Sequence, residues 1–136
     1  MHAIEVNYQG GLRCSAIHLK SGNSILSDAP VDNKGKGEAF SPTDLLCTSL
    51  AMCMLTIMGI AAQEKEIAFE NVCVEVTKIM GSEPRRVSGI QLKFNVPDLG
   101  WTEREWAIMK NAANTCPVAQ SIHPSIQLEV TWTSHA

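Results

Sequence analysis

The amino-acid sequence predicts an α+β protein whose elements follow in the order βββ-α-ββ-α-α-β. Segments in which apolar and polar residues alternate, the period of a half-buried strand, lie on both sides of a long stretch without charges, residues 45–62. Two helix-capping patterns, beginning at Ser41 and at Thr102, mark the starts of the longer helices. Since the 136 residues contain neither an internal repeat nor a linker, we expect one domain, residues 1–136.

Three strands and a loop are expected in the N-terminal part of the chain. Apolar residues alternate with polar ones from Ile4 to Tyr8, and glycine-containing turn signals follow this segment and the next. The strands are therefore expected at residues 4–8, 12–20 and 24–27. Residues 28–40 mix charges with proline and glycine, which is typical of a surface loop.

The central helix has a strong start signal and an apolar body. Ser41 is a natural N-cap, Pro42 suits the first helical position, and Asp44 completes a capping box. The helix is therefore expected from Pro42 to about Gln63. Its charge-free stretch reaches the lower limit of a membrane span, but threonine and serine interrupt it.

A helix that is apolar on every side can equally be the buried centre of a soluble protein, and we expect that arrangement, without a membrane. One sheet covers only one side of such a helix. A second subunit is the simplest cover for the other side.

The C-terminal part is expected to hold three more strands and two helices. Thr102 and Glu105 form a capping box, and the apolar face that follows ends at Cys116. Pro117 breaks this helix and can open a short third one. The strands are expected around residues 72–76, 90–96 and 128–132.

Composition excludes several classes of protein. The net charge of −3, without a basic run, argues against nucleic acid as a partner. The first nine residues lack the basic start and apolar middle of an export signal, so we expect a cytoplasmic protein. Five cysteines are an odd number, which disfavours a disulfide framework, and no CxxC spacing suggests zinc. We expect no metal and no cofactor.

Two cysteines are the strongest candidates for chemistry. Cys53 lies in the middle of the apolar helix, where most cysteines are small buried hydrophobes and a thiolate needs a nearby cation. Cys116 precedes Pro117, so it is either the N-cap of the short helix, where backbone N–H groups favour a thiolate, or the end of the preceding apolar stripe. Arg13 is the candidate cation, although an arginine in a strand is usually only solvated. The structural cysteines are expected to be Cys14, Cys47 and Cys73.

Two motifs resemble those of the osmotically inducible protein C and organic hydroperoxide resistance (OsmC/Ohr) family. The first is Ser41-Pro42-Thr43-Asp44-Leu45-Leu46, with Cys53 eleven residues after the proline. The second is Cys116-Pro117-Val118, followed by Ser121-Ile122-His123-Pro124. The likeness covers nearly the whole chain, because the order of strands and helices is also similar.

The resemblance implies an intertwined homodimer whose central helices are buried between two sheets. It also implies a thiol peroxidase that prefers organic hydroperoxides, with Cys53 as the peroxidatic cysteine, Cys116 as its resolving partner and Arg13 beside the thiolate. An external dithiol, of lipoyl type in some members, would reduce the resulting disulfide. The alternatives are a redox sensor without turnover, and an apolar-ligand binder using residues Met52, Met54, Met58 and Trp106.

One position departs from the family pattern. Peroxidase members carry a glutamate after the proline to hold the arginine, whereas this chain has Thr43. A threonine cannot offer the two-pronged hydrogen bond of a carboxylate. Arg13 would then be held by Asp44, by Glu38, or by no carboxylate at all. We therefore expect weaker peroxidase activity than in members with the glutamate.

Overall fold

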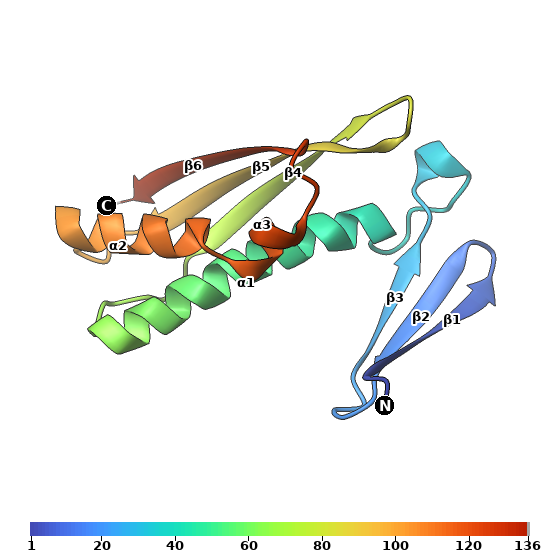
Figure 1. Ribbon diagram of the computed structural model, residues 1–136, viewed down its shortest axis with the longest axis horizontal. Coiled ribbons are helices and arrows are strands. Elements are labelled where there is room, and N and C mark those ends of the chain that lie inside the picture. Colours follow the sequence, from blue (N-terminus) through green and yellow to red (C-terminus); the bar gives the residue numbers. More distant parts are fainter. Residues whose placement is uncertain (136) are drawn as a thin grey trace. The chain divides into compact units, whose positions relative to one another are not determined.

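The computed structural model describes residues 1–135 and confirms the predicted order of elements (Figure 1). Ala136, the last residue of the predicted domain, lies outside the described residues. The chain divides into two compact units, Met1–Leu46 and Cys47–Ala136, and the single domain stays a prediction. The elements are β1 (Ile4–Gly10), β2 (Arg13–His18), β3 (Ser24–Asp28), a 3₁₀ turn (Val31–Asn33), α1 (Pro42–Lys65), β4 (Cys73–Gly81), β5 (Arg86–Pro97), α2 (Glu103–Asn114), α3 (Pro117–Ser121) and β6 (Gln127–His135).

The N-terminal unit is built on an antiparallel sheet in the order β1-β2-β3. The register places Arg13, the first residue of β2, opposite Asp28, the last residue of β3. The expectation that residues 4–8 would be half-buried is wrong for the single chain, because every residue of β1 is exposed. Its alternating apolar side chains therefore face solvent unless another surface covers them.

The loop after β3 is shorter than the surface loop predicted for residues 28–40, and backbone hydrogen bonds fix it in place. Asp28 belongs to the strand rather than the loop, and its backbone N–H donates to the carbonyl of Phe40 at 3.0 Å. The chain approaches itself closely at Gly35, where a Cβ atom would lie 1.8 Å from the carbonyl oxygen of Ala29. Only glycine fits there. These contacts return the chain to the end of β3 and place Glu38 beside it.

The helix α1 begins as the sequence predicts. The N–H of Asp44 donates to the Ser41 hydroxyl at 3.0 Å, and the N–H of Ser41 donates to the Asp44 carboxylate at 2.9 Å, so the capping box is formed. The helix ends at Lys65, two residues beyond the predicted end. It is long and apolar enough to cross a membrane by composition, and 33% of its most apolar window is buried within the chain.

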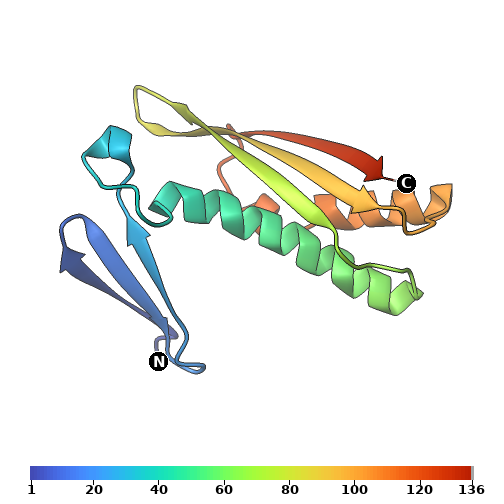
Figure 2. The ribbon, with the colours of Figure 1, turned by 180° about the vertical axis from the view of Figure 1, so that it is seen from behind.

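The C-terminal unit packs helices against one face of a second sheet, in the order β4-β5-β6 (Figures 1 and 2). β4 and β5 are antiparallel, whereas β5 and β6 are parallel and are joined through α2 and α3. Alternate residues of β5 point into the core, and this explains the regular alternation of apolar and polar residues in its sequence. The fully buried large side chains of this core include Leu50, Met54, Met58, Ile90, Leu92, Phe94 and Met109.

The residues proposed to line an apolar pocket do not share one surface. Met54 and Met58 are buried in the core, whereas Met52 is 63% exposed. Trp106 packs edge-on against Trp101 and Trp132, with ring centroids 4.8 and 6.3 Å away. Three of the four side chains are therefore occupied with packing inside the C-terminal unit.

Candidate thiol site

Cys53 lies in the middle of α1, in the part of the helix that belongs to the C-terminal unit. It is half-buried and packs against the core cluster. Cys47, six residues earlier, is fully buried. Six residues rotate a helix by about 600°, so the two thiols point in different directions, as expected.

Cys116 is the N-cap of α3, which confirms one of the two placements considered for it. Its backbone is extended, Pro117 occupies the first turn, and its Sγ atom accepts a hydrogen bond from the N–H of Ala119 at 3.3 Å. The side chain is completely buried. Cys116 belongs to the same buried core cluster as Met109 and Ala113 of α2.

The thiols of Cys53 and Cys116 lie near each other. Cys53 is among the groups that raise the pKa of Cys116, so the fold brings together residues 63 positions apart in the sequence, on α1 and at the start of α3. Neither thiol is in a disulfide, and Cys14, Cys47 and Cys73 form no disulfide either. The structure thus places two reduced cysteines beside each other.

Burial raises the pKa of the Cys116 thiol above its ordinary value of 9.0. The hydrogen bond from the Ala119 N–H acts in the opposite direction, as the sequence suggested, but the contact with Cys53 adds to the effect of burial. Cys116 is therefore held as a thiol at neutral pH. That state suits a residue that reacts second, with an already oxidised partner.

The remaining cysteines lie apart from this pair. Cys14 is half-buried in β2 of the N-terminal unit, and Cys73 is exposed at the start of β4. Within residues 1–135, no group of three histidine, cysteine, aspartate or glutamate side chains is arranged to hold a metal ion.

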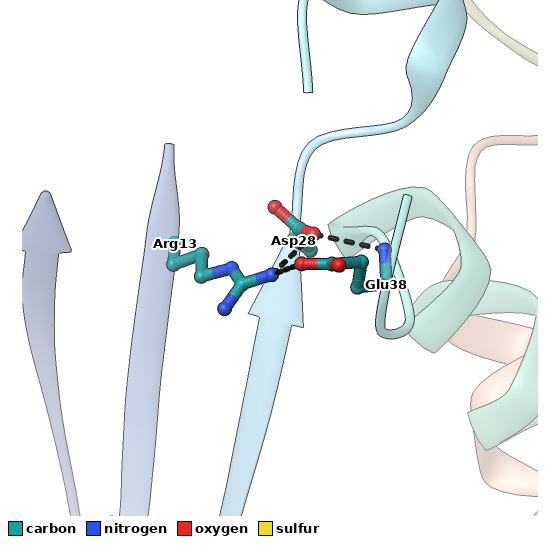
Figure 3. Close-up of polar contacts among 3 residues, drawn as sticks. All are labelled: Arg13, Asp28 and Glu38. Carbon is teal, nitrogen blue, oxygen red and sulfur yellow. Dashed lines mark hydrogen bonds and ion pairs between the residues drawn. The ribbon is translucent and has the colours of Figure 1, made fainter. Parts of the chain in front are cut away.

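Arg13 contacts two carboxylates within the N-terminal unit (Figure 3). Its Nη2 atom donates to Oε1 of Glu38 and lies 3.4 Å from Oδ2 of Asp28. Glu38 is one of the two carboxylates that the sequence suggested as a partner for Arg13. Asp44, the other, instead caps α1 through Ser41.

The sequence pattern does not point to Asp28, because the residue falls in the segment predicted to be a surface loop. Only the register of β2 with β3 predicts the contact between Asp28 and Arg13, because directly opposite residues of neighbouring strands have side chains on the same face of the sheet. This register cannot be predicted without the geometry of the first two turns.

Thr43 bonds to the Ser41 hydroxyl at 3.2 Å. The weaker peroxidase activity expected from a threonine at this position stays a prediction.

The structure is thus an α+β fold that places two cysteine thiols beside each other, one of them at the N-cap of a short helix. The sequence profile of the OsmC-like protein family matches residues 35–131, and the chain belongs to this family. No curated protein matches the sequence.

Solved structures agree with this assignment. A protein of Psychrobacter arcticus 273-4, provisionally named an osmotic stress induced and detoxification response protein, is 53% identical, with a TM-score of 0.93 over 98% of this chain and 96% of that one. An OsmC-like protein from Mycoplasma pneumoniae is 19% identical, with a TM-score of 0.82 over 100% and 98%. An organic hydroperoxide resistance protein OsmC from Legionella pneumophila is 16% identical, with a TM-score of 0.72 over 98% of each chain. The last two share the fold.

Proposed function

We propose that this protein is a thiol-dependent peroxidase that reduces organic hydroperoxides through Cys53 and Cys116. The observation that carries the proposal is the proximity of the two thiols, one half-buried and one fully buried. Membership in the OsmC family supports it, as does the fold shared with a protein named for organic hydroperoxide resistance. We place this activity in the cytoplasm, where the five cysteines would remain reduced between turnovers.

The first step oxidises Cys53. Its thiolate attacks one oxygen of the hydroperoxide, the O–O bond breaks, and the other oxygen leaves as an alkoxide that takes up a proton to form an alcohol. The sulfur now carries the transferred oxygen as a sulfenic acid, two electrons more oxidised than the thiol. Arg13 would assist by donating hydrogen bonds to the peroxide oxygens.

The second step forms the disulfide. The Cys116 sulfur attacks the Cys53 sulfur, and the sulfenic hydroxyl leaves as water with the proton of the Cys116 thiol. Because the pKa of Cys116 is raised, that proton is still present at neutral pH. An external dithiol then reduces the disulfide and is itself oxidised, which returns both cysteines to thiols.

We also propose that the active form is a homodimer. In the N-terminal unit, Val6 and Tyr8 are 64% and 67% exposed, and in the C-terminal unit Met52 and Ile60 are 63% and 47% exposed. Apolar surface of this kind on strands and on a central helix marks an interface. We propose a second copy of the chain as the partner that covers this apolar surface.

Steady-state kinetics test the enzymatic proposal. With excess dithiol, we expect turnover of an alkyl hydroperoxide that is faster than turnover of hydrogen peroxide. Cys53→Ser should abolish it, whereas Cys73→Ser, at an exposed cysteine outside the pair, should leave it unchanged. A single equivalent of oxidation without turnover would indicate a redox sensor. Activity that survives in Cys53→Ser would refute the assignment of the nucleophile.

A further inference from the structure

Asp28 is a buried carboxylate with a defined set of partners in the N-terminal unit. It ends β3, faces Arg13 in the strand register and is inaccessible to solvent. A buried carboxylate costs free energy unless a cation or hydrogen-bond donors compensate for its lost hydration. Among residues 1–135, Arg13 is the cation within ion-pair distance of it. Separating the two would leave an uncompensated buried charge, which makes Asp28 a fixed anchor for the guanidinium.

Asp28 holds the loop as well as the arginine. Its Oδ2 atom accepts hydrogen bonds from Arg13 and from the backbone N–H of Glu38, the latter at 2.9 Å. The Glu38 carboxylate contacts the same arginine nitrogen, but its side chain is 61% exposed. Water weakens an exposed ion pair. The buried partner is therefore the stronger determinant of where the guanidinium lies, and it also places the residue that carries the second carboxylate.

The arrangement leaves most donors of Arg13 available. A guanidinium has five N–H groups, and both carboxylates contact Nη2. The other terminal nitrogen points away from them in Figure 3. Within the described part of the chain, neither Nε nor Nη1 donates to another residue. Donors fixed in this way are what a developing negative charge on oxygen requires.

We propose that Asp28 is the positioning residue for Arg13, in the role that the resemblance gives to the glutamate absent at Thr43. This inference rests on the proposed peroxidase function and names the group that makes its arginine effective. Asp28 holds one edge of the guanidinium, so that the opposite edge is presented to the peroxide. Its Oδ1 atom is buried and has no hydrogen-bond partner among the described residues, so a small rotation would allow a two-pronged contact with Arg13.

The test compares Asp28→Asn with Glu5→Gln, a matched loss of charge at an exposed residue of β1 that bonds to His2 instead. The first readout is the rate at which phenylglyoxal modifies Arg13, mapped by mass spectrometry with the exposed Arg104 as internal reference. We expect Arg13 to react faster only in Asp28→Asn. The second readout is pre-steady-state oxidation of Cys53 by an alkyl hydroperoxide. It should slow about tenfold to a hundredfold, because a misplacement of about 1 Å can cost that much.

The double variant separates positioning from folding. In an Arg13→Ala background, Asp28→Asn should have no further effect on the oxidation rate, whereas a general loss of structure would lower it again. Asp28→Glu, which restores the carboxylate, should recover part of the rate. If Asp28→Asn does not fold, Asp28→Ser removes the same charge with a smaller side chain.

Two results would overturn the inference. One refutes only the positioning role of Asp28, and the other also refutes the proposed peroxidase function. Unchanged modification of Arg13 in the Asp28 variants would refute the positioning role whether or not the protein is a peroxidase. Faster modification together with a wild-type protein that does not react with hydroperoxide would refute the proposed function itself, and the role of Asp28 in catalysis with it.

Discussion

At the scale of single residues, the two cysteines have different environments, and this difference supports the roles that we propose for them. Cys53 is half-buried and accessible from one side of α1, as an attacking nucleophile must be. Cys116 is fully buried, and burial outweighs the helix N–H that would favour its thiolate. With the roles exchanged, the proposed nucleophile would be the fully buried cysteine.

The raised pKa of Cys116 predicts a pH-dependent stability. Above pH 9.0 the unfolded chain releases the Cys116 proton while the folded chain still holds it. The unfolded state then binds fewer protons, so stability is fully present below pH 9 and is lost as the pH rises further. We expect the free energy of unfolding of the reduced protein to fall relative to Cys116→Ser, by at most about 1.4 kcal/mol per pH unit.

Denaturant titrations between pH 8 and 10, at one protein concentration and with reductant present, measure this difference. Cys73→Ser is the matched control, because it removes an exposed thiol and should follow the wild type. Parallel curves for wild type and Cys116→Ser would show that the Cys116 proton is not held by the fold.

At the scale of elements, capping patterns and periodicity were reliable because they are local. The Thr102–Glu105 box forms as predicted, with the Glu105 N–H donating to the Thr102 hydroxyl at 3.2 Å. The order of strands within the sheets is not local. The parallel pairing of β5 with β6 arises from tertiary packing of α2 and α3, which no short pattern reports.

The exposed faces of β1 and α1 predict self-association. Since these elements carry the apolar pattern of buried structure yet are exposed in the single chain, we expect a homodimer at micromolar concentration. Sedimentation equilibrium measures the mass. Ile60→Lys, on the exposed side of α1, should weaken the dimer, whereas Lys110→Glu, an exposed position on α2, should not. A wild-type monomer that remains soluble and folded would contradict the expectation.

At the scale of the whole molecule, the candidate site could be predicted in part. The two motifs single out Cys53 and Cys116, and the fold places these residues near each other, while their pairing under oxidation stays a prediction. The partners of Arg13 did not follow, because they depend on the register of β2 with β3 and on the closure of the loop that returns to Phe40. Long-range geometry of this kind is fixed by packing rather than by sequence pattern.

The most direct test of the account is the identity of the disulfide formed under substrate oxidation. The reduced protein is treated with one equivalent of an organic hydroperoxide, the free thiols are blocked, and the bridged peptides are mapped by mass spectrometry. We expect one dominant bridge, between Cys53 and Cys116, with Cys14, Cys47 and Cys73 recovered as blocked thiols. A dominant bridge that includes Cys47, or oxidation that leaves Cys116 as a thiol, would contradict the account.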